Sequence, residues 1–480
     1  ELYRLYIDEN QPLERRYRQL RESLERVVRE KIQGNSLQTT DLAARINYVA
    51  TQYGLDLKEQ NQLHTFRLTS NDILNHRKSP VKEEFLRDLR AVAYAYRKMF
   101  AQDIPLKLFS VLPKQEIASS GKKEKMEYIR RIRVCFDYAD DTYLYVHPVD
   151  VIADELIRVV YNKPGINHEF EETIKELWRY AQLNLLDVSV DRDGIYTPSF
   201  IVLEPDYLID ISSLAECYKD YGSHPANYFL SRLVPIDNAR PLLLGNIANL
   251  FLDEWIHAGE EEPDYIDCMK KAFRQYPIEL AACAELRDPS KEKEFAKDCR
   301  MHFEHIRDVV QHTFLEPGYN LDKKEAVLEP SYICEALGIQ GRLDYMQRDM
   351  SSFIEMKSGK ADEFSMQGKV EPKENNKVQM LLYMAVLEYS MGQDRRRMHP
   401  YLLYTRYPLL YPARASWAQV RRVINLRNRI VAAEYGVQFH NHPDFTRNLL
   451  AQINPEVVNE RKLSGRFWEQ YLKPSICLLY

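Results

Sequence analysis

The chain has 480 residues, of which 45% are hydrophobic and 29% are charged, and its formal net charge is −5. This composition is typical of a globular protein with more than one domain, and the net charge gives no overall support for a nucleic-acid partner, so such binding would need local patches. No apolar run approaches the roughly 18 residues of a membrane span, so we expect no membrane partner.

The seven cysteines are scattered, odd in number and include no C-x-x-C pair. This pattern favours free thiols in a reducing compartment, and we expect a cytoplasmic location. The sequence starts at Glu1 without a Met and stops at KPSICLLY. We therefore expect it to be a piece of a longer protein.

Residues 1–115 predict a helical N-terminal region. Segments 12–33 and 79–100 carry apolar residues at helical spacing between Arg and Glu residues, and Ser79 and Pro80 suit a helix start. Their basic residues would either follow a phosphate backbone or form a solvated helix face, and the solvated face is favoured.

Residues 120–194 predict a small strand-rich mixed domain. Segments 128–138 and 142–148 are rich in Tyr, Val and Ile and alternate in polarity, as half-buried strands do. Segment 168–191 is interpreted as one helix, after which residues 194–210 return to strand.

Residues 195–435 predict an α/β domain. Several helical segments precede a strand-rich block around residues 341–360, and then come a strong helix at 375–391 and a strand near 398–407. Alternation of this kind is typical of an α/β core. Residues 436–480 are assigned to a C-terminal helical extension, leading into a missing region.

The stretch GRLDYMQRDMSSFIEMKSGK, residues 341–360, carries the chemistry. Asp344 ends an apolar run. Glu355 comes after SSFI, which is predicted to be the next strand of a hairpin whose turn lies near residues 347–350. Strand side chains alternate, so Glu355 and Lys357 share a face. Two carboxylates with the Met356 carbonyl suit Mg²⁺ or Mn²⁺, and Lys357 would orient a water or offset charge. The alternative is an exposed hairpin that carries these charges by chance.

A second pattern follows on the helix at 375–391. Gln379 and Tyr383 lie at i and i+4, so both project from one helical face. Taken alone, this pair equally fits polar residues at the margin of a core helix.

Together, GRLD, EMK and QMLLY resemble the PD-(D/E)XK nuclease superfamily, and within it the RecB-like branch. The resemblance covers residues 195–435 and is closest to the nuclease domain of replication nuclease-helicases that trim flaps and to CRISPR-associated adaptation exonucleases. It implies a restriction-endonuclease-like mixed sheet flanked by helices. It also implies metal ligation by Asp344 and Glu355, catalysis by Lys357, and DNA or active-site contacts by Gln379 and Tyr383.

Two departures from that branch affect the expected cofactors. Asn249 stands where the branch usually has a His that supplies a further metal ligand. Asn249 would ligate the metal more weakly than a His, or Asp253 would take its place. Alternatively, Asn249 is only a polar residue on a packed helix. Many relatives hold an iron–sulfur cluster on four cysteines, but only Cys217 and Cys477 stand near the matching places. We expect Mg²⁺ or Mn²⁺ and no iron–sulfur cluster, with Cys217 as a buried thiol.

Further residues near this block have weaker patterns. Glu329 is a candidate for supporting the metal from behind, and segment 361–376 is interpreted as a loop over the site. His302 and His305 share a helical face and are interpreted as part of a solvated helix rather than a metal site. Lysines surround the proposed cleft and would either contact phosphate or lie in a solvated loop: Lys357, Lys360, Lys369, Lys373 and Lys377.

The leading hypothesis is a metal-dependent DNA nuclease that acts on single-stranded or flapped DNA, as the nuclease part of a replication or repair nuclease-helicase. No G-x-x-x-x-G-K-[ST] loop occurs in the chain, so a helicase partner is expected C-terminal to it or in trans. The alternative is a catalytically weak module that binds branched or single-stranded DNA or scaffolds partner proteins. A metalloenzyme for small phosphates is a third, weaker reading.

Overall fold

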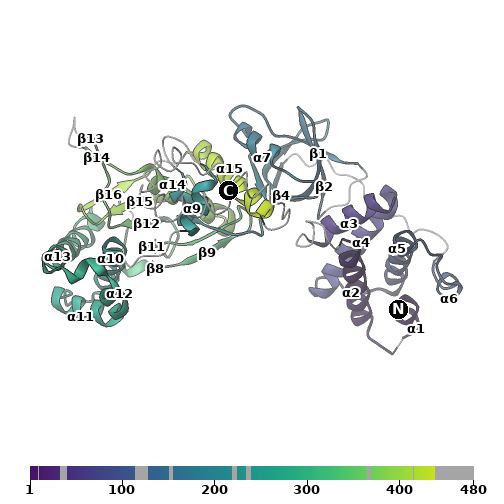
Figure 1. The fold of residues 1–480 in the computed structure, drawn as a ribbon, viewed down its shortest axis with the longest axis horizontal. Helices are drawn as coiled ribbons and strands as arrows, with labels where there is room; N and C mark the ends of the chain where they lie inside the picture. Colours follow the sequence, from purple (N-terminus) through teal and green to yellow (C-terminus); the bar gives the residue numbers. More distant parts are fainter. Residues whose placement is uncertain are drawn as a thin grey trace, which may run out of the picture. The chain divides into compact units, whose positions relative to one another are not determined.

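The protein is described by a computed structural model (Figure 1). Its described residues divide into two compact units, one formed by Glu1–Pro205 with residues 431–437 and the other by Asp206–Ile430. The structure describes residues 1–8, 10–32, 41–113, 128–150, 155–218, 224–233, 239–319, 321–364, 369–413 and 416–437.

The first unit begins with a bundle of helices (Figure 1). These are α1 (Leu2–Ile7), α2 (Leu13–Lys31), α3 (Leu42–Gln52), α4 (Leu57–Leu74), α5 (Lys82–Phe100) and α6 (Leu106–Phe109). The apolar stripe of each long helix faces the common core, where Tyr17, Phe66 and Phe85 are completely buried. The helices that periodicity predicts at 12–33 and 79–100 are thus confirmed as α2 and α5.

A strand-rich part follows in the same unit. It contains β1 (Tyr128–Ala139), β2 (Tyr143–Pro148), β3 (Ile157–Val160), η2 (His168–Phe170), α7 (Glu171–Lys175), β4 (Gln182–Val190), β5 (Ile195–Thr197) and β6 (Phe200–Leu203). The long strand β1 pairs with β4 through its first half and with β2 through its second half. Because β3 also pairs with β5 and β5 with β4, five strands close into a barrel, and β6 extends β4.

The prediction of one helix at 168–191 is wrong. Only its first part is helical, and the rest is the barrel strand β4, of which every residue from Gln182 to Leu186 is buried. A strand covered on both faces loses its alternating pattern, so its apolar run resembles a buried helix. Strands β5 and β6 also bring residues 195–203 into the first unit, because both pair with β4.

The second unit is a mixed α/β structure, as expected from the alternation of elements. Its helices are α8 (Ile211–Glu216), α9 (Ala226–Leu233), α10 (Arg240–His257), α11 (Tyr265–Gln275), α12 (Pro277–Ala282), η3 (Ala284–Arg287), α13 (Pro289–Gln311), η4 (Thr313–Leu315), η5 (Lys323–Glu325) and α14 (Glu374–Met391), and α15 (Trp417–Tyr435) follows them. None of the described helices is both long and apolar enough to cross a membrane.

The described strands of the second unit form three sheets. They are β7 (Ile209–Asp210), β8 (Ala326–Leu328), β9 (Ser331–Cys334), β10 (Ile339–Arg342), β11 (Tyr345–Gln347), β12 (Ser352–Lys357), β13 (Asp362–Phe364), β14 (Lys369–Glu371), β15 (His399–Tyr404) and β16 (Leu409–Pro412). The main sheet has the order β16-β15-β12-β11-β8, with β12 and β15 parallel. A second sheet, β7-β10-β9, leads into it, because β10 is followed directly by β11.

The central strand β12 is buried on both faces. Ile354 and Met356 point to one face and join a core formed with residues of α10 and α13. Glu355 and Lys357 point to the other face, where Gln379 of α14 meets them. Helix α14 is itself buried over most of its length, from Val378 to Leu387, so the charged side chains of β12 lie in a largely enclosed place.

Candidate functional site

Asp344 stands between two sheets. It follows β10 and precedes β11, and β11 pairs with β12 in an antiparallel hairpin, as the sequence predicts. The Asp344 carboxylate accepts a hydrogen bond from the Met356 backbone N–H at 2.6 Å. This bond takes the place of a further rung of the β11–β12 ladder and fixes Asp344 beside the strand that carries Glu355.

Glu355 and Lys357 lie on the same face of β12 and touch. The Lys357 ammonium is 2.9 Å from Glu355 Oε1, and the Gln379 side-chain amide donates to the same oxygen at 2.6 Å. Gln379 also reaches the Ser212 hydroxyl at 3.0 Å. Glu355 is only 4% exposed, so these donors fix its position in an almost dry environment.

The second oxygen of Glu355 differs from the first. Its Oε2 atom is buried and makes no hydrogen bond among the described residues. A buried carboxylate oxygen without a donor is costly, because desolvation is not repaid. An unpaired acceptor of this kind next to a second carboxylate is what a site for a hard cation requires.

The electrostatics of the two carboxylates agree with this interpretation. Burial first, and the nearby charge of Asp344 second, raise the pKa of Glu355 from 4.5 to about 8. Burial also raises the pKa of Asp344, although the N–H of Met356 opposes it. Burial alone would lower the pKa of Lys357, but the Glu355 carboxylate outweighs it and the net shift is upward. The pair thus gains from any added positive charge.

Tyr383 belongs to the neighbourhood but does not hold Glu355. Its hydroxyl donates to the Arg342 carbonyl at 2.6 Å, which ties α14 to the end of β10. Gly341 makes this approach possible, because a Cβ atom there would lie 2.9 Å from the Tyr383 hydroxyl oxygen. Gly341 therefore has a packing role in this structure.

Helix α10 lies at the end of β12. A Cβ atom on Gly245 would be 3.3 Å from the Ser358 hydroxyl, just after Lys357. Asp253 lies two turns further on, and its pKa is raised to about 6 by burial and then by the charge of Glu329, with a smaller effect from Asp344. Asn249 is half-buried between these two positions on the helix, so α10 brings Asn249 and Asp253 to the side of the site.

Glu329 is held close to Asp344 by the backbone. Its N–H donates to the Asp344 carbonyl at 3.1 Å, and its φ angle is +49°. Its carboxylate pairs with Arg342 at 2.8 Å. Its backbone thus lies beside Asp344 while its carboxylate is engaged by Arg342, and the supporting role suggested from the sequence stays a prediction.

These groups do not form a ready-made metal centre of the His, Cys and carboxylate kind. Among the described residues, no three His, Cys, Asp or Glu side chains gather closely enough to hold a metal ion. The donors present are the Asp344 and Glu355 carboxylates and the Met356 carbonyl, which faces Asp344 because its own N–H does. Oxygen donors of this kind fit Mg²⁺ or Mn²⁺, which retain several waters.

Helix α8 contributes residues that the sequence interpretation missed. Asp210 caps its N-terminus through the Ser213 N–H at 2.9 Å, and Ser212 binds Gln379. Glu216 accepts from Asn375 at 2.8 Å and adds negative charge near Lys357. An Asp before a helical segment is a recognisable N-cap signal in the sequence. Only the parallel pairing of β10 with β7, however, places α8 beside this site.

The two histidines of α13 are not on a solvated helix, so that interpretation is wrong. His302 is completely buried, and burial lowers its pKa from 6.5 to about 4. His305 lies 3.0 Å from the Thr405 carbonyl oxygen through Nδ1. Both side chains therefore lie where α13 packs against the end of β15. The polar residues around them in the sequence did not indicate this burial.

The lysines predicted near the site differ in their exposure and partners, and the predicted loop contains regular structure. Lys360 is exposed, and Lys377 pairs with Glu374 at 3.7 Å within α14. Lys373 directly precedes α14, and its backbone N–H donates to the Tyr404 hydroxyl at 3.1 Å. The segment interpreted as a loop at 361–376 contains the hairpin β13–β14 and the start of α14.

Of the two cysteines considered for an iron–sulfur cluster, only Cys217 lies among the described residues. Cys217 is 1% exposed, which confirms a buried thiol, and its sulfur lies 3.3 Å from the Ser213 carbonyl oxygen. Cys477 and most of the predicted extension at 436–480 lie outside the described residues.

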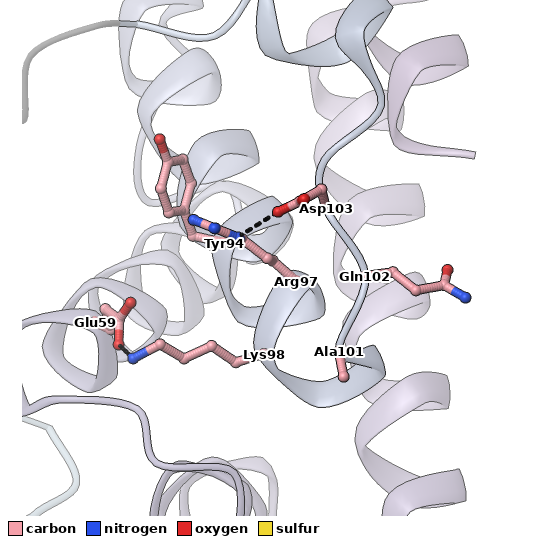
Figure 2. Close-up of a pocket in the computed structure, with 7 residues that line it drawn as sticks. All are labelled: Glu59, Tyr94, Arg97, Lys98, Ala101, Gln102 and Asp103. Atoms are coloured by element: carbon pink, nitrogen blue, oxygen red, sulfur yellow. Dashed lines mark hydrogen bonds and ion pairs between the residues drawn. The ribbon is translucent and has the colours of Figure 1, made fainter.

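A cavity of about 460 Å³ lies in the helical bundle of the first unit (Figure 2). Its charged side chains satisfy one another: Lys98 pairs with Glu59 at 2.5 Å and Arg97 with Asp103 at 3.1 Å. Because these pairs leave no unpaired buried charge aimed into the cavity, it offers less chemistry than the Asp344–Glu355–Lys357 cluster.

Comparisons with known proteins add no assignment. No family model matches the sequence, and no curated protein matches it significantly. The functional argument therefore depends on the geometry of the cluster formed by Asp344, Glu355, Lys357, Gln379 and Tyr383.

Proposed function

We propose that the second unit is a metal-dependent nuclease that hydrolyses phosphodiester bonds in single-stranded or flapped DNA. One observation carries the proposal. Glu355 is fixed at one oxygen by Lys357 and Gln379, while its other oxygen is buried near Asp344 and has no partner in the part of the chain that the structure describes. A buried carboxylate oxygen without a donor, beside a second buried carboxylate, is stabilised by a bound cation.

The order of the elements supports a PD-(D/E)XK core within this proposal. A strand leads to Asp344, an antiparallel hairpin carries Glu355 and Lys357, and α14 supplies Gln379. Strand β15 then lies parallel to the Glu355 strand. The resemblance in sequence and this order of elements point to the same chemistry.

In the proposed mechanism each side chain has a separate task. Asp344, Glu355 and the Met356 carbonyl would hold Mg²⁺ or Mn²⁺, with Asn249 or Asp253 approaching from α10. The bound ion would supply Lewis-acid polarisation of the phosphate and a more acidic water. Lys357 places a positive charge where negative charge develops on the phosphate and orients the attacking water. Gln379 keeps the Glu355 carboxylate in position.

The test is a cleavage assay on labelled single-stranded and flapped DNA with Mg²⁺ or Mn²⁺. Lys357→Ala is expected to lower the cleavage rate by roughly 100-fold or more, because it removes a charge that stabilises the transition state. Lys297→Ala is the matched control, since Lys297 is an exposed lysine on α13. Equal rates for wild type and Lys357→Ala would contradict the proposal.

The second candidate is a module that keeps the nuclease fold and binds branched or single-stranded DNA without efficient cutting, or scaffolds partner proteins. Asn249, in place of the His that the RecB-like branch uses, favours it. Glu355→Ala separates the two: the nuclease loses cleavage and retains binding, whereas a binding module shows no cleavage to lose. If wild type does not cut, Asn249→His is the next variant. A helicase partner follows from the resemblance alone.

A further inference from the structure

The strand-rich part of the first unit has a topology with a known use. Going around the barrel, the order is β1-β2-β3-β5-β4 and back to β1. β3 and β5 are parallel, and the short helix α7 lies between β3 and β4 in the chain. This is the connectivity of the OB fold, a Greek-key barrel that binds oligonucleotides or oligosaccharides on the face of its second and third strands.

That face carries a row of tyrosine rings. Tyr138 of β1 lies opposite Tyr145 of β2, and their rings stack with centroids 4.3 Å apart and planes 13° from parallel. Tyr143, two residues before Tyr145, therefore points to the same face and meets its ring edge-on at 6.5 Å. Tyr138 is 50% exposed. Exposed stacked rings on a sheet surface are the platform on which successive bases stack.

A guanidinium group completes the row. Arg158 of β3 is paired across the sheet with Tyr145, and its guanidinium carbon lies 5.8 Å from the centre of the Tyr143 ring. It also donates to the Asp193 carbonyl at 3.2 Å, which joins β3 to the β4–β5 loop. A cation next to stacked rings suits a phosphate-linked chain of bases better than an uncharged sugar chain.

The rings are held in place before any ligand arrives. Asp140, in the β1–β2 loop, accepts from the Thr142 and Tyr143 N–H groups at 2.8 and 2.7 Å and from the Tyr145 hydroxyl at 2.9 Å. These bonds fix both the loop and the Tyr145 ring. Preorganisation of this kind lowers the entropic cost of binding.

Another part of the barrel surface, further along the same strands, has a different role. Cys135 of β1, Val149 after β2 and Tyr180 before β4 belong to the hydrophobic core of the helical bundle, and the Tyr180 hydroxyl donates to Thr51 at 2.9 Å. The helices thus cover one part of the barrel surface, whereas the tyrosine face keeps its exposed ring.

We propose that this tyrosine face, formed by Tyr138, Tyr143, Tyr145 and Arg158, binds single-stranded nucleic acid by base stacking. This site is independent of the proposed nuclease centre, because it uses only residues of the first unit. DNA and RNA share the bases and phosphates that the face recognises, so the test includes both.

The experiment measures binding of the whole chain to labelled oligothymidylate and oligouridylate of about 16 nucleotides, a length within the range covered by one OB fold. EDTA is present, so that the proposed nuclease centre does not cleave the oligonucleotides. The double variant Tyr138→Ala/Tyr145→Ala is expected to bind at least roughly tenfold more weakly, because stacking of even one base is lost. Stronger binding of one oligonucleotide identifies the preferred sugar.

Two controls make the result specific. Tyr128→Ala removes a tyrosine that is 62% exposed on the other end of β1, and is expected to bind like wild type. Tyr138→Phe/Tyr145→Phe retains the rings and is also expected to bind like wild type. Unchanged binding in the double Ala variant, equal loss in the Phe variant, or no binding by wild type would each overturn the proposal.

If the double Ala variant does not fold, photocrosslinking of wild type replaces it. Oligonucleotides that carry 5-iodouracil are expected to crosslink to Tyr138, Tyr143 or Tyr145, as mapped by mass spectrometry. Crosslinks confined to residues of the second unit would overturn the proposal, and they would leave the nuclease proposal untouched. Conversely, a chain that binds through these tyrosines but does not cut would contradict only the nuclease.

Discussion

The central residue of the candidate site is Glu355, whose two carboxylate oxygens have different surroundings. One oxygen accepts from the Lys357 ammonium and the Gln379 amide, and the other is buried without a partner within the described ranges. Since Gln379 holds one oxygen while the other lies beside Asp344, we interpret Gln379 as a positioning residue of the proposed cation site.

Gln379→Ala is therefore expected to weaken the apparent affinity for Mn²⁺ or Mg²⁺ by roughly 10- to 100-fold, the usual cost of removing a group that orients a metal ligand. The measurement is the cation concentration that gives half-maximal cleavage. Maximal cleavage at saturating cation is expected to recover in large part. A lower maximal rate at an unchanged half-saturating concentration would contradict a positioning role.

Two glycines of the same stretch allow a matched comparison. Gly341→Ala would place a Cβ atom 2.9 Å from the Tyr383 hydroxyl and 3.1 Å from Ile211 Cδ1, whereas Gly359→Ala would meet nothing within 4 Å. Overpacking of this kind costs about 1–3 kcal/mol. Urea unfolding is expected to show that loss for Gly341→Ala and a much smaller change for Gly359→Ala. Similar stability of the two variants would show that α14 moves away freely.

At the scale of elements, the site is formed where four of them meet. The hairpin β11–β12 carries the charged residues, α14 covers their face, α10 lies at the strand end, and α8 supplies Ser212. The bond from Tyr383 to the Arg342 carbonyl ties α14 to β10. Each of these contacts joins segments that are far apart in the sequence or lie on different strands.

In the helical bundle of the first unit, Asp88 joins α5 to α2. It is 1% exposed and accepts from the Tyr17 hydroxyl at 3.1 Å and from Arg87 at 2.8 Å. Burial raises its pKa from 3.8 to about 6, although Arg87 opposes this shift. Between these two values the folded chain holds a proton that the unfolded chain has lost, so the contribution of Asp88 to stability falls as pH rises.

Asp88→Asn is expected to remove that dependence. The difference in the free energy of unfolding between wild type and variant should change by at most about 1.4 kcal/mol per pH unit from pH 4 to 6, and then stay constant above pH 7. Denaturant unfolding at several pH values measures it. Asp103→Asn, at an exposed carboxylate of the same unit, is the control, and a parallel pH dependence in both variants would contradict the assignment to Asp88.

At the scale of the whole molecule, cation binding is expected to act on stability before any cleavage is observed. A ligand that binds only the folded state at 100 times its dissociation constant stabilises it by about 2.7 kcal/mol. Mn²⁺ is therefore expected to raise the unfolding temperature of wild type and to have little effect on Asp344→Asn or Glu355→Gln. Equal stabilisation of all three proteins would place the cation elsewhere.

Much of the second unit could be predicted from local patterns. The alternation in FIEMK predicted that Glu355 and Lys357 share a face, and the turn at QRDM predicted the hairpin. The i, i+4 spacing placed Gln379 and Tyr383 on one side of a helix, and both reach the same neighbourhood. These predictions held because strand and helix periodicity are properties of the backbone that each residue obeys locally.

Other features depended on contacts that no local pattern contains. Strand β4 resembled a helix because it is covered on both faces, and His302 resembled a solvated residue because its neighbours on α13 are polar. The barrel whose surface carries Tyr138, Tyr145 and Arg158 closes only because β1 pairs with β4, although β2 and β3 lie between these two strands in the sequence.

The sequence by itself determined which residues could carry chemistry: two carboxylates, a lysine and a Gln-x-x-x-Tyr helix at suitable spacing. Only the tertiary structure decided that one oxygen of Glu355 is satisfied and the other is not, that Tyr383 anchors α14 rather than touching Glu355, and that α8 joins the site. The physical reason is that spacing fixes which face a side chain occupies, whereas burial and partners depend on the elements that pack against that face.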